Sequence, residues 1–426
     1  MLREPREHLM FTLRQLISAF VAPFILQMCV ANGAAQDGPL VEVNPSGGVD
    51  AVDAGPPWRL PVKITLTGNA GYDDNADTSA SNGGGSLYTS GGINLSYEFG
   101  TERTRASLST YAGLTYYSDM DRSPFDPNVN LALSVRHAVN QRLSLTGSVD
   151  ARYQIDPDFE IEGSLNRRSG NYFYNRDSIS GTYLWLPRVS TVSTYTFGLL
   201  QYDEQVIGPQ RDYVNHAIAQ QIRFLLLPVT ALTAGHSLSI VSSDERNGSS
   251  FTNSLTAGVD QTIGRRLNGS LNVGAQFYSN DNAGGEFEES GTAVSPYFAG
   301  NLSYVVGAKT SLTWNGQYSI DEFSSQSGGG RMLTTGLRLA YSITARISAT
   351  ASANYRRYSN DRPTDDVALD TSDFSEDAFD VTIAGSYMVN RLLSANIGYQ
   401  HTRVSADGTL GSYSRNRYFI GFSSTF

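Results

Sequence analysis

Apolar and polar residues alternate strictly along many long stretches of this chain. From Leu143 to Tyr153, every second residue is apolar or glycine, and hydroxyl or charged side chains fill the positions between them. The same alternation runs from Leu393 to Gln400. A period of two residues places successive side chains on opposite faces of a β-strand. The pattern therefore predicts strands with one apolar and one polar face, longer than the roughly 5–6 residues of an ordinary strand.

A short polar break precedes these runs, as in VNQRLSLTGSV from Val139 and VNRLLSANIGY from Val389. We interpret each break as a tight turn. Eight turns are marked by a basic residue or its equivalent, namely Arg105, Arg142, Arg188, Thr230, Arg266, Lys309, Arg346 and Arg391. Between them lie nine longer segments rich in Gly, Asn, Asp, Ser and Pro, which are typical of loops. These are residues 73–86, 118–128, 154–170, 203–211, 243–249, 280–290, 322–331, 359–375 and 405–411.

Such turns and loops separate about 18 strands. An even number of long strands, joined alternately by short turns and longer loops, is typical of bacterial outer-membrane barrels. A β-solenoid has shorter repeats, a propeller blade lacks such long alternation, and a sandwich places turns every 8–12 residues or so. We therefore predict an all-β fold for residues 62–426, a transmembrane antiparallel up-and-down β-barrel.

Composition and the chain ends agree with a lipid-embedded barrel. Only 17% of the residues are charged and 11% are aromatic. Aromatic residues gather at strand ends, as at Tyr116-Tyr117 and Phe277-Tyr278, where we expect them to form girdles at the lipid headgroups. The last strand carries apolar residues on one face, which resembles the C-terminal signal read by the barrel assembly machinery. Its residues are Tyr418, Ile420, Phe422 and Phe426.

The N-terminus has the features of a secretory signal. Arg3, Arg6 and Arg14 precede an apolar stretch at residues 16–31, and small residues follow at 33–35. The stretch is short for a membrane anchor and contains a proline. We predict a signal peptide at residues 1–35, a flexible periplasmic segment at 36–61 and export to the outer membrane of a Gram-negative cell. Cys29, the single cysteine, lies in the signal, so no disulfide is expected in the exported chain.

The polar face of each strand is expected to line the lumen, and about eighteen strands leave room for an aqueous channel. Charges of both signs occur there, so no strong ion selectivity follows. These residues are compatible both with a water-filled channel that has no specific solute and with a binding track for sugars. The predicted lumen-lining charges are Arg136, Asp150, Arg152, Arg223, Asp260, Asp321, Arg338 and Asp380.

The third long segment is the longest loop and contains acids followed by bases. By position and charge it resembles the inward-folded third loop of classical porins, and it is a candidate pore constriction; a solvated surface loop is the alternative. Its charged residues are Asp156, Asp158, Glu160, Glu162, Arg167 and Arg168. Acid clusters at residues 73–77 and 361–373 could bind divalent cations at the lipopolysaccharide surface, or could simply be solvated.

Catalysis finds little support in the sequence. His137, His216, His236 and His401 form no spaced metal pair, and no G-x-S-x-G or H-E-x-x-H motif occurs. We expect no enzyme activity, no cofactor and no metal site. The formal net charge of −10 also argues against a nucleic-acid partner.

Residues 71–75, GYDDN, and the hairpin sequence at residues 211–239 resemble a family of bacterial outer-membrane porins. Some barrels of that type accompany exopolysaccharide or capsule assembly systems. The resemblance implies a channel, either a porin for small solutes or an export conduit working with periplasmic polysaccharide-export components. A structural or polymer-binding barrel with a closed lumen is the third alternative. The expected surroundings are outer-membrane lipid and lipopolysaccharide.

Overall fold

The computed structural model describes residues 62–80, 83–120, 124–158, 161, 167–168, 170–203, 212–243, 248–264, 266–281, 292–321, 330–360, 374–407 and 411–426. The predicted signal peptide and periplasmic segment, residues 1–35 and 36–61, lie outside this part of the chain. No helix among the described residues is long and apolar enough to cross a membrane.

The described residues form eighteen strands. They are β1 (Val62–Asp73), β2 (Ser86–Gly100), β3 (Thr104–Tyr117), β4 (Phe125–Ala138), β5 (Leu143–Gln154), β6 (Tyr172–Leu186), β7 (Val189–Tyr202), β8 (Tyr213–Leu227), β9 (Thr230–Ser243), β10 (Gly248–Ile263), β11 (Leu267–Asp281), β12 (Thr292–Gly307), β13 (Thr310–Asp321), β14 (Gly330–Ser342), β15 (Ile347–Asn360), β16 (Phe374–Met388), β17 (Leu393–Ala406) and β18 (Tyr413–Thr425).

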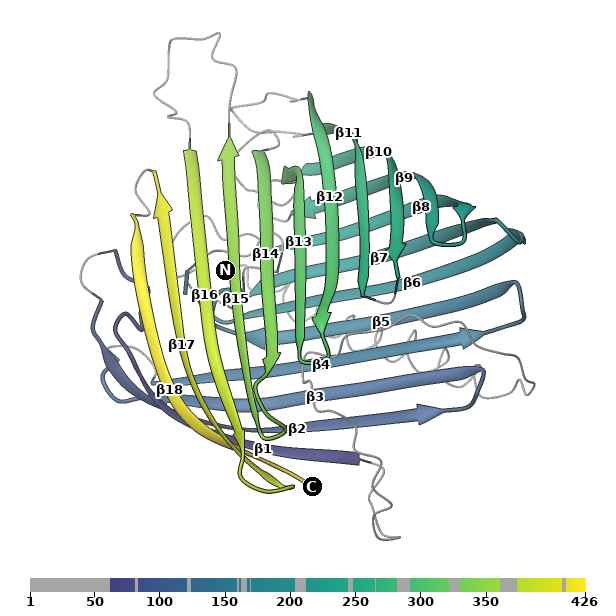
Figure 1. Cartoon of the computed structure of the whole chain (residues 1–426). Helices are drawn as coiled ribbons and strands as arrows, with labels where there is room; N and C mark the ends of the chain where they lie inside the picture. The colour runs from purple at the N-terminus through teal and green to yellow at the C-terminus, as the bar shows by residue number, and fades with distance from the viewer. Residues whose placement is uncertain are drawn as a thin grey trace, which may run out of the picture.

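Each strand pairs antiparallel with its neighbours in the chain, and β1 also pairs with β18, from Thr65 with Thr425 to Asp73 with Arg417. This last ladder closes the sheet into a barrel, and Figure 1 shows β18 beside β1 and β2. Short turns join the strands at one end and the longer segments at the other. The predicted fold, with eighteen strands and alternating connections, is confirmed.

Residue parity separates the two faces of the barrel wall. On β18, Ile420 and Phe422 point outward, and more than half of each side chain is exposed. Arg415 and Arg417, at odd positions, point inward and contact residues of other elements. The register of every ladder carries this division around the ring, because paired residues share a face. The outward face is rich in exposed Leu, Ile, Val and Phe, and the inward face is polar.

The sequence predicts that aromatic residues near the strand ends face the lipid headgroups, but only some of those near the long loops do so. The two residues of each adjacent pair point to opposite faces because the strand is pleated. Tyr116 is 43% exposed on the outer face, whereas Tyr117 is 1% exposed on the inner face. Nine inward-facing tyrosines are buried near the long-loop ends of their strands: Tyr88, Tyr117, Tyr172, Tyr174, Tyr202, Tyr213, Tyr278, Tyr358 and Tyr413.

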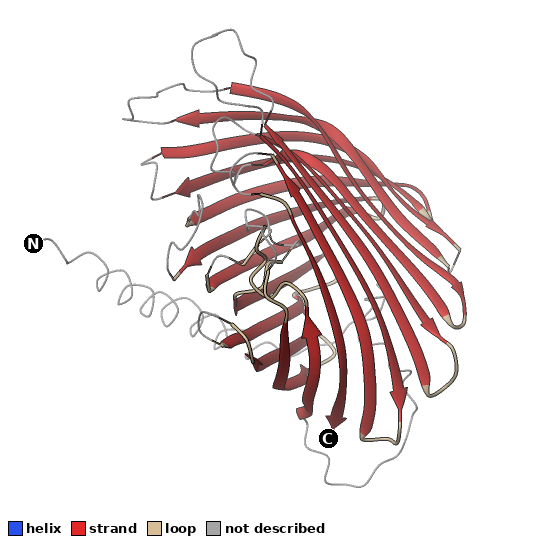
Figure 2. Ribbon diagram, turned by 90° about the vertical axis from the view of Figure 1, so that its left-hand side faces the viewer, coloured by secondary structure: helices blue, strands red, loops and turns tan. Residues whose placement is uncertain are grey.

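Parts of the long connections lie inside the wall of strands, where Figure 2 shows several tan loop segments. One buried cluster joins Ile161, from the connection between β5 and β6, to inward side chains of β6–β9. Another joins Ala76, from the connection between β1 and β2, to Tyr88 and Tyr117. The apolar core of this molecule is thus small and lies within the barrel, next to the long-loop end.

Close packing on the outer face requires glycine beside Trp314. A Cβ at Gly316 would lie 2.8 Å from the Trp314 ring, and one at Gly300 would lie 3.1 Å from it. The indole Nε1 donates to Thr335 Oγ1 at 3.0 Å, which fixes the ring across both glycines. We expect Gly316→Val to destabilise the barrel by about 1–3 kcal/mol, as overpacking does.

The midpoint of urea unfolding in detergent measures this effect. Gly385→Val is the matched control, because a Cβ there meets its nearest neighbour, Ile397, at an ordinary 3.6 Å. Equal midpoints for the two variants would contradict this account of Gly316.

Candidate functional site

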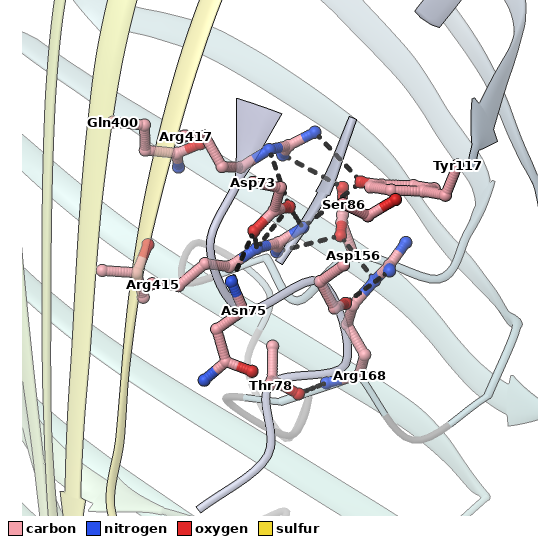
Figure 3. A network of polar contacts seen from close by, with 12 residues as sticks. Asp73, Asn75, Thr78, Ser86, Tyr117, Asp156, Arg168, Gln400, Arg415 and Arg417 are labelled. Carbon is pink, nitrogen blue, oxygen red and sulfur yellow. Dashed lines mark hydrogen bonds and ion pairs between the residues drawn. The ribbon is translucent and has the colours of Figure 1, made fainter. Parts of the chain in front are cut away.

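A cluster of charged and hydrogen-bonding side chains occupies the barrel interior near the long-loop end (Figure 3). It gathers residues from the two strands that close the barrel, from β3 and β4, and from the first and third long connections. Its principal members are Asp73, Asn75, Thr78, Tyr117, Asp126, Asp156, Arg168, Arg415 and Arg417.

The closing ladder supplies the centre of this cluster. Asp73 is the last residue of β1 and pairs with Arg417 in the register, while Arg415 lies two residues away on the same face. Arg415 donates from Nη2 to Asp73 Oδ2 at 2.7 Å and from Nε to Oδ1 at 3.1 Å. Asp73 is fully buried and Arg415 is 4% exposed. A buried charge is tolerated only when paired, and this two-pronged contact meets that need.

Asp156, from the third long connection, contacts three arginines. Its Oδ1 lies 2.8 Å from Arg168 Nε and 3.2 Å from Arg415 Nη1, and its Oδ2 lies 3.3 Å from Arg417 Nη1. Burial alone would raise the pKa of Asp156, but the three guanidinium groups outweigh it and hold the pKa well below its usual range. The carboxylate therefore remains charged and ties the third connection to β18.

Arg168 ties the third connection to the first connection and to β4. Its backbone N–H donates to Thr78 Oγ1 at 3.0 Å, and its Nη1 donates to the carbonyl oxygen of Ala76 at 2.7 Å. Its Nη2 pairs with the Asp126 carboxylate, and its guanidinium lies over the Tyr117 ring, 5.1 Å from the centroid. The Arg168 side chain is fully buried, so these contacts take the place of water at its two terminal nitrogens.

The first connection folds locally around Asn75. Its backbone N–H donates to Asp73 Oδ1 at 3.2 Å, and its side-chain Oδ1 accepts from the Ser79 N–H at 2.9 Å. Such turns are characteristic of aspartate and asparagine, whose short side chains mimic a backbone group. The Asn75 amide also donates to the carbonyl oxygen of Ser414 at 3.0 Å. The turn is thereby held against β18, with Ala76 and Thr78 facing Arg168.

The third connection also reaches the opposite wall. Ile161 is 2% exposed and belongs to the cluster with Tyr172 and Tyr174 of β6. Its carbonyl oxygen accepts a 3.0 Å hydrogen bond from Arg356 Nη2 of β15. β6 and β15 stand nine strands apart in either direction around the ring. Arg167, further along, donates to the Gly411 carbonyl oxygen at 3.1 Å. The connection between β5 and β6 therefore crosses the interior.

The candidate constriction residues are only partly described. Glu160 and Glu162 lie outside the described residues. Asp158 pairs with Arg152 Nη1 at 2.6 Å, and Arg152 also binds Asp150. Asp156, Arg167 and Arg168 make the contacts given above. The structure thus places the described members of this set inside the barrel.

The predicted lumen-lining residues occupy inward positions on their strands, with the Asp321 side chain outside the described part. Arg223 Nε lies 3.3 Å from Asp260 Oδ2. Asp380 accepts from Gln400 Nε2 and Thr402 Oγ1, each at 2.8 Å. The inward positions also include Arg136 on β4 and Arg338 on β14. Several inward charges are thus already paired within the wall.

The acid cluster at residues 73–77 is not simply solvated. Asp73 is buried against Arg415, and Asp74 accepts from the Asn416 amide at 2.6 Å. Residues 361–373 lie outside the described part. Within the described ranges, no three His, Cys, Asp or Glu side chains gather in a way that could hold a metal ion.

Residues 227–426 match the family model described as "Putative beta-barrel porin 2". The matched segment begins at the end of β8 and includes β18, the strand that closes the barrel. The second half of this barrel is therefore similar to that porin family. A search of curated proteins finds no match to this chain.

Solved porins are distantly similar to this barrel. A BenF-like porin from Pseudomonas fluorescens Pf-5 is 13% identical over 86% of this chain and 99% of that one, with a TM-score of 0.44. The outer membrane protein OpdK from Pseudomonas aeruginosa is 12% identical over 86% and 99%, with a TM-score of 0.45. OccAB4 from Acinetobacter baumannii is 8% identical over 87% and 100%, with a TM-score of 0.42. At this low sequence identity, no functional residue and no solute specificity of these porins is assigned to this chain.

The depressed pKa of Asp156 predicts a pH dependence of stability. A carboxyl whose pKa is lowered by folding stabilises the fold above its unfolded pKa and loses that effect as pH falls through the folded value. Asp156→Asn should therefore lower barrel stability by about 1.5–3 kcal/mol, the range for hydrogen bonds to charged groups. The difference from wild type should persist from pH 8 to about pH 4 and vanish only in stronger acid.

Thermal unfolding in detergent across this pH range is the measurement. Asp407→Asn is the control, since Asp407 accepts from Ser375 and contacts no arginine in the described ranges. A difference between wild type and Asp156→Asn that disappears near pH 5 would mean that the arginines do not hold Asp156 ionised.

Proposed function

We propose that this barrel is a passive channel for small hydrophilic solutes, narrowed inside by the connection between β5 and β6. The strongest support for this proposal comes from the contacts of Ile161. Ile161 packs with side chains of β6 and accepts a hydrogen bond from Arg356 on the opposite strand β15. A segment anchored to both walls reduces the cross-section available to solutes, as an internal constriction does.

The chemistry of the wall supports hydrophilic cargo without strong charge selection. Inward positions carry hydroxyl and amide side chains together with arginines and aspartates. At the cluster, the charges of Arg168, Arg415 and Arg417 are matched by Asp73, Asp126 and Asp156. Such pairing weakens the net field in the pore, so small neutral and zwitterionic solutes fit it better than one sign of ion.

Two other functions compete with this proposal. An exopolysaccharide conduit, working with periplasmic export components, would need the crossing segment to leave the interior before a polymer could pass. A structural barrel with a closed lumen would keep the segment in place permanently. For small solutes to pass, the crossing segment need not leave the interior, and the lumen must stay partly open.

Conductance of the purified, refolded protein in planar bilayers separates these functions. We expect steady current steps that small neutral sugars reduce and that large dextrans leave unchanged. Silent bilayers from a correctly folded barrel would favour the closed structural barrel. Current reduction by long polymers entering wild-type protein would favour the conduit.

Arg356→Ala tests the constriction itself. Loss of the guanidinium frees the Ile161 carbonyl from β15, and we expect the conductance to rise about twofold because the crossing segment loses one anchor. Arg223→Ala is the matched control, because it also removes one inward positive charge. Arg223 pairs with Asp260 on β10 and not with the crossing segment. Equal conductance in both variants would mean that the Arg356 anchor does not set the pore width.

A further inference from the structure

One sector of the outward face carries polar side chains along its strands. On four adjacent strands, a row of hydroxyl, amide and imidazole groups points outward. The row consists of Ser193 on β7, Gln220 on β8, His236 on β9 and Asn253 on β10. These are the fifth of fourteen, eighth of fifteen, seventh of fourteen and sixth of sixteen residues of their strands. The row therefore lies away from both membrane surfaces.

The members of the polar row are linked in pairs. Ser193 Oγ donates to Gln220 Oε1 at 2.6 Å, and His236 Nε2 lies 2.9 Å from Asn253 Oδ1. Gln220 and His236 face each other in the register of β8 and β9, so the two pairs adjoin. Both bonds use amide oxygens. They leave the amide nitrogens of Gln220 and Asn253 without an acceptor in the described part of the chain.

Further polar groups extend this sector toward the long-loop end. The Tyr195 hydroxyl lies 2.8 Å from His216 Nδ1 on the outward face of β7 and β8. On β6, Asp177 also points outward, in register with Val149 and Phe197. Its Oδ1 is buried and has no hydrogen-bond partner. A partner approaching the polar row would meet the unused amide nitrogens of Gln220 and Asn253.

The rest of the outward face differs. Central positions on the other strands carry exposed apolar side chains, such as Ile93, Leu131, Leu337, Ile383, Ile397 and Ile420. Outside β6–β10, the described strands carry outward amide or imidazole groups only at His137 on β4 and at His401 and Asn416 on β17 and β18. His401 and Asn416 form one such pair, on β17 and β18 only, near the long loops.

Lipid cannot complete the hydrogen bonds of the polar row. Acyl chains offer neither donors nor acceptors, so exposed amides there are costly unless protein covers them. Exposed Ile218, Ile222, Leu232 and Leu255 flank the row. A polar line bordered by apolar side chains is suited to contact with another membrane-embedded protein, which can supply the missing hydrogen-bond partners.

We propose that this sector is the contact surface between two copies of this chain, related by a two-fold axis along the membrane normal. Amide and hydroxyl groups both donate and accept, so the row can bind its own copy. All copies insert in the same orientation, which places each row at the same depth. A contact between unlike surfaces would need a second polar row elsewhere, and the described outward face has none. The contact is therefore between like surfaces.

Cysteine cross-linking in isolated outer membranes tests the contact directly. In a Cys29→Ser background, Gln220→Cys should form a disulfide-linked homodimer on mild oxidation, because residues near a two-fold axis approach their own copies. Ile383→Cys is the control, since Ile383 is 53% exposed on β16, away from the row. Dimer formation at position 383 equal to that at 220, or none at 220 in a folded barrel, would overturn the proposal.

Loss of the polar groups provides a second test. The double variant Gln220→Leu with His236→Leu should halve the protein mass measured by native mass spectrometry in mild detergent. His401→Leu, an outward histidine in another sector, should leave the dimer mass unchanged. Faster migration of unheated samples in gels verifies that each barrel is folded. A trimer in wild type, or a Gln220→Cys variant that cross-links only to a different protein, would contradict a two-fold contact.

Discussion

The structure depends on satisfying every backbone hydrogen bond within the chain. Lipid supplies no donors or acceptors, so a sheet in the membrane cannot leave an edge. The ladder between β1 and β18 removes the last edge and pairs Thr65 with Thr425 at one end and Asp73 with Arg417 at the other. Closure over eighteen strands then creates an interior too wide for wall side chains to fill. The long connections partly fill that interior, which is why the buried core lies inside the ring.

Ion pairs hold the connections within the interior. Arg415 and Arg168 are almost completely buried, and each binds a carboxylate on the wall, Asp73 and Asp126 respectively. Asp156 touches both arginines and so joins the two pairs. Removing one partner would leave a buried charge unpaired, which costs far more than the net value of the pair. The cluster therefore specifies one position for the third connection, even where its contribution to stability is modest.

The sequence predicted the strands well because alternation is a local property. Every turn and loop could be placed from breaks in that pattern, and the inward charges, such as Asp150 and Arg338, followed from parity alone. The partners of Asp156 could not be predicted. Arg415 is 259 residues away in the sequence, and only ring closure brings it near. Parity alone puts Arg415 on the inner face of the last strand, but nothing local distinguishes it from other inward arginines.

The surroundings of aromatic and polar residues on the inner and outer faces of the barrel could not be predicted from the sequence either. Tyr117 looked like a headgroup anchor beside Tyr116, and register shows it buried under the loops. In the sequence, His236 is an isolated histidine, which gives no indication of its neighbours. Its place in a row with Gln220 and Asn253 depends on the alignment of three strands. Contacts across strands require the register, which periodicity does not supply.

The position of the cluster at the closing ladder has a consequence for biogenesis. Asp73 comes from the first strand and Arg415 from the last, so their pairing cannot exist until the final hairpin has met the start of the sheet. Until then, the buried aspartate and the arginines that contact Asp156 lack part of their neutralising charge. The contacts that join the third connection to β18 can therefore form only when the wall is complete, and an unfinished barrel leaves these charges unpaired at its open edge.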